Sequence, residues 1–431
     1  MKFIDVQEFI SWVQVQKRFS KKVSLDKMKY YCNLFNNPQD KFKSIHVTGT
    51  NGKGSTVAML KNILIKKGLH IATYTSPYIT CFNERITYDN QYISDDELLK
   101  YANLILSKYR QIEKDGYELP TFFEFITLVA FLYFSNLDDL DLAIVEVGMG
   151  GRLDATNVIT PLLSIITNVA FDHMQVLGNT LEEILGEKLG IVKEKIPFIC
   201  GIDTTDLQNI CLDVAKHKDT IVIFPAFDKV KVQKVAIDYS LFSYENFKDI
   251  RLNLAGFHQI HNALVVIEAF KLLKDILKNY DITLIDDDLY IGLSDVTWVG
   301  RLEMISKNPL ILLDGGHNID GVNSICRFVK SLPYSKKRAI VAISHDKELT
   351  NMIHLIDQTF TEIIFVQYTY ARSAKASELY QISKAKNKKY EESLERAIEE
   401  VYQKPVDFTI FFGSLYLVSE IRNLLKRKSD M

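Results

Sequence analysis

The sequence contains few cysteines and no long apolar run. Its five cysteines among 431 residues are scattered, odd in number and without a C-x-x-C spacing, which excludes a disulfide framework and a zinc site and fits a reducing compartment. No uncharged stretch is long enough to span a bilayer. Residues 1–13 alternate charged and apolar groups and lack the apolar core of a secretory signal. We therefore expect a cytoplasmic protein.

A strong charge of either sign is also lacking. The chain has 52 basic and 54 acidic residues, and its formal net charge is −2. This balance argues against a nucleic-acid or membrane partner, because either would need a basic face. Hydrophobic residues make up 47% of the chain, a globular composition whose length suggests two or three domains. We expect a monomer that acts on small molecules.

The most informative stretch of the sequence is residues 44–56. Here a short apolar strand turns through glycines into a helix that should run over 55–67. Such a P-loop binds phosphates through backbone N–H groups, and its lysine neutralises the outer phosphates. The usual Ser or Thr directly after Lys53 is missing, because Gly54 precedes Ser55. We predict a nucleotide site; the alternative is an ordinary strand–helix turn, which would not need Lys53.

Strands alternate with helices along the rest of the chain, which predicts an α/β fold with a mostly parallel sheet and helices on both faces. The expected strands lie at 70–74, 141–147, 162–167, 197–200, 221–224, 310–313, 338–344, 361–366 and 407–412. The expected helices include 3–19, 25–35, 94–109, 122–134, one opening at 180, and 260–277. The pattern restarts near 295–300, so we place an ATP-binding domain with a short helical leader at 1–296 and a smaller α/β domain at 297–431.

Polar side chains follow several of these strands, on the side where a parallel sheet binds its ligands. Ser76 follows one strand, Glu146 lies near the end of another, and His173 follows a third. A hydroxyl and a carboxylate suit Mg²⁺, while a histidine suggests a second metal site with mixed ligands. A carboxylate within an apolar strand is costly unless a cation or donors meet it. Glu146 therefore indicates a functional residue. For Ser76 and His173, a functional role is no better supported than the simpler interpretations, which are a turn residue for Ser76 and a surface residue for His173.

Short motifs along the chain carry a resemblance to a known family. They are residues 46–55, 75–77, 84–86, 146–157, 187–191 and 314–318. Together, and in this order, they closely resemble folylpolyglutamate synthase/dihydrofolate synthase, the folate branch of the Mur ligase superfamily. The glycine-rich run 146–157 is the most specific of them. The resemblance implies a P-loop parallel-sheet domain of Mur ligase type followed by a smaller Rossmann-like α/β domain.

The resemblance also implies an activity and roles for residues. The activity is ATP-dependent addition of L-glutamate to a folate, and to dihydropteroate, through an acyl phosphate. The ATP contacts would be Thr50, Asn51, Gly52, Lys53, Gly54, Ser55, Asn262, Arg301 and Asp314. The metal ligands, for two Mg²⁺ ions, would be Ser76, Glu146, His173 and Lys188, the last carrying a CO₂-derived carbamate. The catalytic residues would be Lys53, Lys188 and His317, a candidate base. The pterin-bearing substrate would lie near Thr121, Phe122, Phe123, Glu124, Leu153, Asp154 and Ala155. A K⁺ ion is a further candidate cofactor.

The carbamate on Lys188 makes chemical sense, because it turns a cation into an anion that supports a second Mg²⁺. Without the resemblance, the simpler interpretation is an exposed helix lysine paired with Glu187 or Glu183. Lys193 is the only nearby rival for the modification.

The substrate residues also have simpler interpretations. Thr121 and Glu124 fit a helix capping box, and Phe122 and Phe123 are better explained as core than as a stacking platform. In some family members an Asp-Leu-Gly segment helps to hold dihydropteroate, and residues 22–24 of this chain do not match it. The resemblance therefore supports the folate activity more strongly than the dihydropteroate activity.

Two rival functions remain. Peptidoglycan Mur ligases carry an N-terminal UDP-sugar domain, for which the short stretch before the P-loop leaves no room. A P-loop switch or motor would need neither the motifs of the second domain nor a carbamylated lysine. Turnover of ATP that requires both a pteroate and L-glutamate distinguishes the ligase from the switch.

Overall fold

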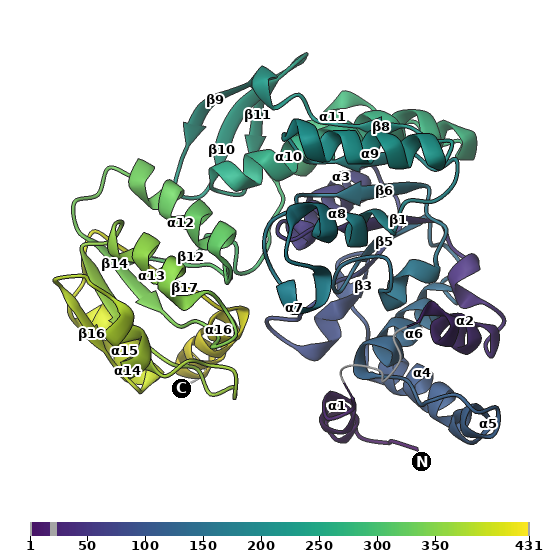
Figure 1. Cartoon of the computed structure of the whole chain (residues 1–431), viewed down its shortest axis with the longest axis horizontal. Coiled ribbons are helices and arrows are strands. Elements are labelled where there is room, and N and C mark those ends of the chain that lie inside the picture. The colour runs from purple at the N-terminus through teal and green to yellow at the C-terminus, as the bar shows by residue number, and fades with distance from the viewer. Residues whose placement is uncertain (1, 18–23, 430–431) are drawn as a thin grey trace. The chain divides into compact units, whose positions relative to one another are not determined.

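The computed structural model describes residues 2–17 and 24–429. They form two compact units (Figure 1), the first made of residues 1–227 and 262–293 and the second of residues 228–261 and 294–431. Residues 22–24, which were compared with the Asp-Leu-Gly segment, lie largely outside the described residues: of the three, only Ser24 is described.

The first unit is built on an eight-stranded sheet. Its strand order is β4-β3-β2-β5-β1-β6-β7-β8, and only the pairs of β3 with β2 and with β4 are antiparallel. The strands are β1 (Ser44–Thr48), β2 (Ile71–Tyr74), β3 (Ile86–Tyr88), β4 (Gln91–Tyr92), β5 (Leu142–Glu146), β6 (Leu163–Ile166), β7 (Phe198–Cys200) and β8 (Val222–Ile223). The mostly parallel sheet expected from the sequence is confirmed.

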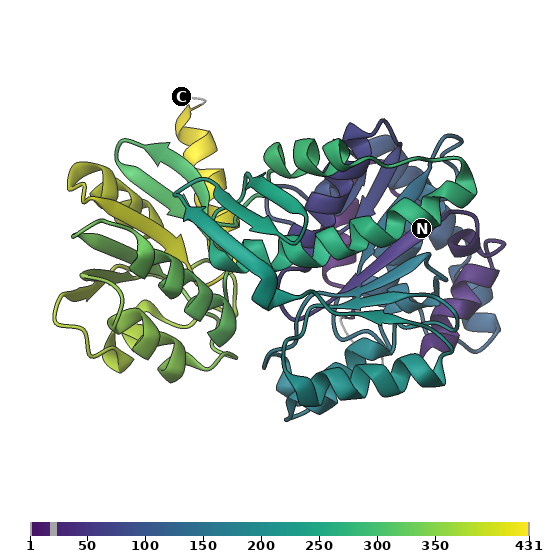
Figure 2. The same ribbon diagram turned by 90° about the horizontal axis from the view of Figure 1, so that it is seen from above.

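Helices cover both faces of this sheet. On one face, Tyr74 and Val145 pack with α4 (Asp95–Ser107) and α6 (Phe122–Phe134) in one buried cluster. Further along that face, Ile166 and Phe198 pack with α8 (Leu181–Leu189) and α9 (Thr205–His217). The P-loop helix α3 (Lys53–Lys66) contacts β1, β2 and β5, and Figure 2 shows α3 (purple) and α9 (teal) on opposite sides of the strands. The first unit thus has the layers of an α/β nucleotide-binding domain.

The remaining helices of this part of the chain are α1 (Val6–Gln14), α2 (Leu25–Asn33), α5 (Tyr109–Lys114), α7 (Met174–Leu177), α10 (Phe257–Ile276) and α11 (Asp286–Ser294). Local sequence signals set several helix ends. Reciprocal capping boxes begin α6 at Thr121 and α8 at Thr180, as their sequences predict. Helix α3 ends at Lys66, and Gly68 follows with a φ of 93°, a conformation that glycine adopts without strain.

The second unit contains a six-stranded sheet in the order β12-β13-β17-β14-β15-β16. Only β12 is antiparallel to its neighbour. The strands are β12 (Glu303–Lys307), β13 (Leu310–Leu313), β14 (Lys337–Val341), β15 (Glu362–Phe365), β16 (Lys388–Tyr390) and β17 (Phe408–Phe412). Its helices are α12 (Ile319–Ser331), α13 (Leu349–Asp357), α14 (Ala376–Ile382), α15 (Leu394–Gln403) and α16 (Leu415–Ser429). The α/β pattern expected after residue 300 is confirmed.

An antiparallel three-stranded sheet was not anticipated. It comprises β9 (Val230–Val235), β10 (Ser240–Tyr244) and β11 (Phe247–Leu252). Val235 and Ile237 pack against the core of the second unit, and Ala255 is part of that core. This packing explains why residues 228–261 group with the second unit, whereas the sequence suggested a single division at 296–297.

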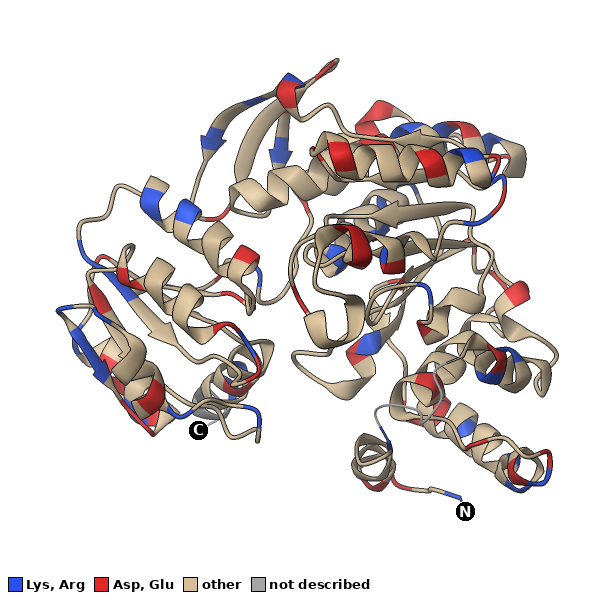
Figure 3. Cartoon of the chain, in the orientation of Figure 1, with Lys and Arg blue, Asp and Glu red and all other residues tan. Residues whose placement is uncertain are grey.

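Acidic and basic side chains are interspersed within each unit (Figure 3), as the near-zero net charge leads one to expect. None of the helices in the described part of the chain combines the length and apolarity needed to cross a membrane.

Candidate active site

The candidate site lies at the carboxyl ends of four neighbouring strands, β2, β5, β1 and β6. Ser76 follows β2, Glu146 ends β5, the P-loop follows β1, and the segment from Asn168 to His173 follows β6. Because parallel strands end at one edge of the sheet, the topology brings these groups to the same edge. The sequence had placed each residue after a strand, and the strand order makes them neighbours.

The P-loop has a backbone that only glycine suits. Gly52 has a φ of 83°, and a Cβ built on it would lie 2.2 Å from the Oδ1 atom of Asn262. The structure thus brings Asn262, from α10, against the loop that was expected to bind ATP with it. Lys53 Nζ donates to the carbonyl oxygens of Gly49 and Thr50 at 3.1 and 3.4 Å. The ammonium group therefore folds back over the loop, where it can neutralise a bound phosphate.

Two hydroxyls at the start of α3 support a ligand at this loop. The Oγ of Ser55 and the Oγ1 of Thr56 are buried, and neither has a hydrogen-bond partner among the described residues. A buried hydroxyl without a partner is costly, and a phosphate or its metal ion would satisfy one. Together with the N–H groups at the helix N-terminus, this donor set fits the phosphates of a nucleotide.

Residues at the end of β6 also shape the loop, although the sequence did not predict a role for them. Asn168 accepts the Asn51 N–H through Oδ1 at 2.8 Å and the Thr50 N–H through its carbonyl oxygen at 3.1 Å. The Thr167 hydroxyl donates to the Asn51 carbonyl oxygen at 2.5 Å. The sequence showed that they lie at or just beyond the end of a strand, but not that this strand lies beside the P-loop strand.

Glu146 is the buried carboxylate of the site. Its side chain is 4% exposed, and its Oε2 accepts the backbone N–H of Ser76 at 3.2 Å. The structure therefore brings together the two residues expected to bind one Mg²⁺. His173 is exposed and precedes α7 with a φ of 51°.

The expected magnesium ligands are of several kinds and are not a cluster of carboxylates and histidines. No group of three or more His, Cys, Asp and Glu side chains in the described ranges is placed to hold a metal ion. The expected ligands draw instead on the Ser76 hydroxyl and on a carbamate at Lys188, which supply the hard oxygens that Mg²⁺ prefers.

Lys188 is buried in α8, with 2% of its surface exposed, so the interpretation as an exposed helix lysine is wrong. Glu187 instead pairs with Arg152 at 2.7 Å, and Glu183 closes the capping box of α8. Burial, together with the nearby charge of Lys53, lowers the pKa of Lys188 to about 7. A large fraction of Lys188 is then the neutral amine at neutral pH, and only the amine can react with CO₂.

The glycine-rich run after β5 folds back over β1. The Thr48 hydroxyl donates to the Gly150 carbonyl oxygen at 2.6 Å. The carboxylate of Asp154, at 8% exposure, accepts the Met149 N–H at 3.0 Å and the Thr156 hydroxyl at 2.6 Å. Burial raises the pKa of Asp154 above its ordinary value. Asp154 therefore holds the turn that presents its neighbours Leu153 and Ala155, rather than lying open to a ligand.

The expected substrate residues 121–124 lie at the N-terminus of α6, where two of them cap the helix. Glu124 accepts the Thr121 N–H at 2.8 Å and lies 3.4 Å from the buried ammonium of Lys27. Phe122 and Phe123 are half-buried, and a Cβ at Gly148 would lie 2.5 Å from the ring of Phe123. The capping box is confirmed, and Phe123 lies against the glycine-rich run.

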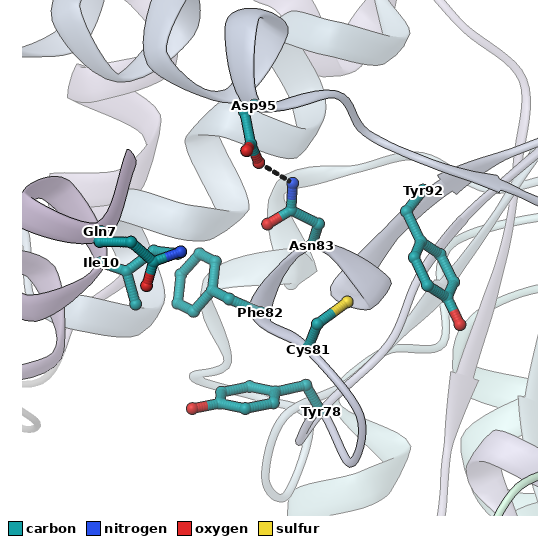
Figure 4. A pocket seen from close by; sticks show the side chains of 8 residues that line it. All are labelled: Gln7, Ile10, Tyr78, Cys81, Phe82, Asn83, Tyr92 and Asp95. Atoms are coloured by element: carbon teal, nitrogen blue, oxygen red, sulfur yellow. Dashed lines mark hydrogen bonds between the residues drawn. The ribbon is translucent and has the colours of Figure 1, made fainter. Parts of the chain in front are cut away.

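A cavity of about 450 Å³ opens beside this region (Figure 4). It is lined by Gln7, Ile10, Tyr78, Cys81, Phe82, Asn83, Tyr92 and Asp95. Asn83 Nδ2 donates to the Asp95 carboxylate and to the Ile93 carbonyl oxygen, both at 2.8 Å. Tyr78 lies two residues after Ser76, but none of the expected substrate residues lines the cavity.

The second unit holds its own cluster of expected residues. Asp314 is 3% exposed and accepts the N–H groups of Leu302 and Gly316 at 2.8 and 2.7 Å. The guanidinium of Arg301 lies so close to Gly315 that a Cβ there would be 2.5 Å from Nη1. His317 Nδ1 lies 3.0 Å from the Gly315 carbonyl oxygen. Arg301, Asp314 and His317 are thus grouped around one turn after β13.

Comparisons with known proteins agree with this architecture. Residues 47–270 match the model of the Mur ligase middle domain, and residues 298–425 match that of the dihydrofolate synthetase C-terminal domain. The chain is 36% identical to dihydrofolate synthase/folylpolyglutamate synthase of Bacillus subtilis, with 98% of this chain and 100% of that protein covered. It is 32% identical to folylpolyglutamate synthase of Lacticaseibacillus casei, with 97% and 98% covered.

Solved structures give the same result. The fold is similar to folylpolyglutamate synthase from Thermotoga maritima, with a TM-score of 0.84, 30% identity, and 98% and 96% of the two chains covered. It is also similar to an FPGS–AMPPCP–folate complex, with a TM-score of 0.84, 29% identity, and 98% and 100% covered.

The P-loop sheet and the second α/β unit define the protein as an ATP-dependent ligase with the Mur ligase fold. Within that class, the chain belongs to the folylpolyglutamate synthase/dihydrofolate synthase family.

Proposed function

We propose that the protein joins L-glutamate to a reduced folate, and to dihydropteroate, at the expense of ATP. The observation that carries this proposal is the convergence of the P-loop, Ser76 and Glu146 at the carboxyl ends of adjacent strands. Relatives named for both activities, such as the Bacillus subtilis protein, favour the dual activity.

The chemistry needs a carboxylate made reactive. The γ-phosphoryl group passes to the substrate carboxylate, the amine of L-glutamate attacks the acyl phosphate, and phosphate leaves. Lys53 offsets charge on the phosphoryl group, and the N–H groups of the loop hold the phosphates. Ser76, Glu146, His173 and the carbamate of Lys188 would hold two Mg²⁺ ions, which supply further charge neutralisation when bound. Asn262, Arg301 and Asp314 would bind ATP, and His317 is the candidate base for the amine.

Lys188 is proposed to be carbamylated because its burial favours the reactive amine. The Nζ lone pair would form a bond to the carbon of CO₂ as one C=O π bond opens to give the carboxylate oxygen, and one proton would leave Nζ for water. We retain the substrate assignment to Thr121–Glu124 and Leu153–Ala155, with Phe123 and Leu153 as contacts and Asp154 and Glu124 as groups that hold the turn and the helix end. The K⁺ ion remains a candidate without assigned ligands. The five cysteines are free thiols, which supports our proposal of a cytoplasmic protein.

The test incubates purified protein with MgATP, L-glutamate and either tetrahydrofolate or dihydropteroate, and follows the products by mass. We expect a mass increase of one glutamyl residue on each acceptor, with ADP formed only when both co-substrates are present. If tetrahydrofolate is glutamylated and dihydropteroate is not, the protein is a folylpolyglutamate synthase only. ATP hydrolysis that ignores both co-substrates would refute the ligase and favour a P-loop switch.

A further inference from the structure

Lys193 is a half-buried lysine that takes no part in the proposed ligase chemistry. It lies in the turn after α8, five residues beyond Lys188, and the sequence offered it only as a rival site for carbamylation. Burial, reinforced by the charges of Lys218 and Lys29, lowers the pKa of Lys193 to about 8. The group therefore remains mostly an ammonium at neutral pH, although it is half-buried.

The contacts of Lys193 explain why it stays charged. Its Nζ donates to the carbonyl oxygen of Asn157 at 2.9 Å and to the Oδ1 of the same residue at 2.8 Å. Both partners are acceptors, and charge-assisted hydrogen bonds to them are stronger than neutral ones. These two bonds favour the ammonium form, which has no lone pair to attack CO₂, so Lys188 is the better candidate for the carbamate.

Asn157 passes this contact on to α8. Because Oδ1 faces the ammonium, its Nδ2 must face the other way, and the amide orientation is fixed. Nδ2 donates to the carbonyl oxygen of Gly190 at 2.9 Å and to that of Arg152 at 3.1 Å. One amide thus connects the turn after α8 with the glycine-rich run.

The two segments approach each other closely at this point. A Cβ on Gly190 would lie 2.3 Å from the Cα of Arg152, and a Cβ on Gly151 would lie 2.9 Å from the carbonyl oxygen of Lys188. The Arg152 N–H donates to the Glu187 carbonyl oxygen at 2.7 Å. The backbone on either side of Lys188 is therefore fixed to the run that follows Glu146.

We propose that Lys193 is a positioning residue for the ligase reaction, and that through Asn157 it holds the Lys188 turn of α8 against the glycine-rich run. This inference rests on the proposed function, since it takes Lys188 as the residue that carries the carbamate. Its physical basis is that mutation of a group that orients a metal ligand commonly lowers activity or metal affinity by about 10–100-fold.

The test compares variants of the full-length protein with tetrahydrofolate, L-glutamate and MgATP. Lys193→Met is expected to lower kcat about 10–100-fold, while KM for ATP changes little because the P-loop contacts are untouched. Lys193→Arg keeps a cation with several donors and is expected to retain most of the kcat that Lys193→Met loses. Lys216→Met, on the exposed surface of α9, serves as the control and should retain the kcat of the unmodified protein.

A spectroscopic readout separates positioning from general instability. The carbamate carbon is observed by NMR after exchange with ¹³C-bicarbonate and assigned by its loss in Lys188→Ala. Its signal should weaken in Lys193→Met. Since that variant leaves two buried acceptors unpaired, Lys193→Gln, which keeps an N–H donor, is measured beside it at a smaller cost in stability.

Asn157→Asp provides an independent variant. It keeps an acceptor for Lys193 but loses the N–H groups that reach Gly190 and Arg152, so it should lower kcat and the carbamate signal as Lys193→Met does. Folded Lys193→Gln and Asn157→Asp proteins with unchanged kcat and carbamate signal would overturn the inference. Absence of the ¹³C carbamate signal from the unmodified protein would also overturn the positioning role of Lys193. If the protein has the carbamate signal but no ligase activity, the proposed function is refuted, and the positioning role is then judged from the carbamate signal of the variants.

Discussion

The stability of the protein should fall between neutral and mildly acidic pH because of His46, which lies in β1 beneath the glycine-rich run. Its side chain is fully buried. The Thr156 hydroxyl donates to Asp154, so the Thr156 oxygen accepts from His46 Nε2–H at 2.8 Å. The other ring nitrogen, Nδ1, has no partner among the described residues. Protonation there would place an unpaired charge in the core.

Burial, together with the nearby charge of Lys193, lowers the pKa of His46 to about 3. In the unfolded chain the imidazole takes up a proton near its ordinary pKa of about 6.5. Below that pH the unfolded state binds a proton that the folded state does not, so stability is full above about 6.5 and falls as the pH drops toward 3. The slope is about 1.4 kcal/mol per pH unit, and the loss between about pH 7.5 and about pH 5 is about 2 kcal/mol.

The assay is urea unfolding at both pH values for the unmodified protein and for His46→Gln. Glutamine keeps an N–H that can reach Thr156 but does not titrate. Other titrating groups are shared by the two proteins, so their effects cancel in the difference. The free energy of unfolding of the unmodified protein should fall relative to the variant by about 2 kcal/mol on acidification. An equal difference at the two pH values would refute the buried neutral histidine.

Further predictions concern the site itself. Gly52→Ala should abolish nucleotide binding, because the new methyl group would meet the amide of Asn262 at a φ of 83°; Gly68→Ala, with φ 93° and open space around it, is the matched control in a fluorescent-nucleotide titration. Lys188→Ala should lose ligase activity, with partial recovery on addition of a short-chain carboxylate; unchanged activity would remove Lys188 from the site. Glu146→Gln should lose turnover while its Tm stays level or rises, since a buried charge is removed; a large fall in Tm would indicate a structural role instead.

The sequence predicted the layered α/β fold because the elements that form it carry strong local signals. The apolar strand before the P-loop, the capping boxes at Thr121 and Thr180, and Gly68 after α3 all act within a few residues. The three strands of residues 230–252 gave no such signal. Strand β9 is mostly exposed and half of β11 is exposed, so they lack the apolar run that marked the buried strands, and the buried strand β10 is interrupted by serines.

The candidate site was only partly predictable, because its critical relations are between strands. Glu146 stood out by its burial in an apolar strand, but its contact with Ser76 depends on β2 lying beside β5. Asn168 could not be recognised as part of the P-loop, since nothing local indicates that β6 lies beside β1. Only the family resemblance separated Lys188 from Lys193 in the sequence, and the structure adds that Lys188 is buried whereas Lys193 is half-buried and donates to Asn157.

Lys53 and Lys188 illustrate how one close approach can have two chemical consequences. The fold brings these two lysines close enough for the charge of one to lower the pKa of the other. The positive charge of Lys53 repels a protonated Lys188, which burial also deprives of hydration, so the ammonium form of Lys188 is disfavoured in the absence of ligands. A carbamate on Lys188 would reverse the sign of one charge and turn the repulsion into attraction, while supplying an anion for Mg²⁺. The same proximity would thus favour both the neutral amine, the form that can react with CO₂, and the proposed carbamate.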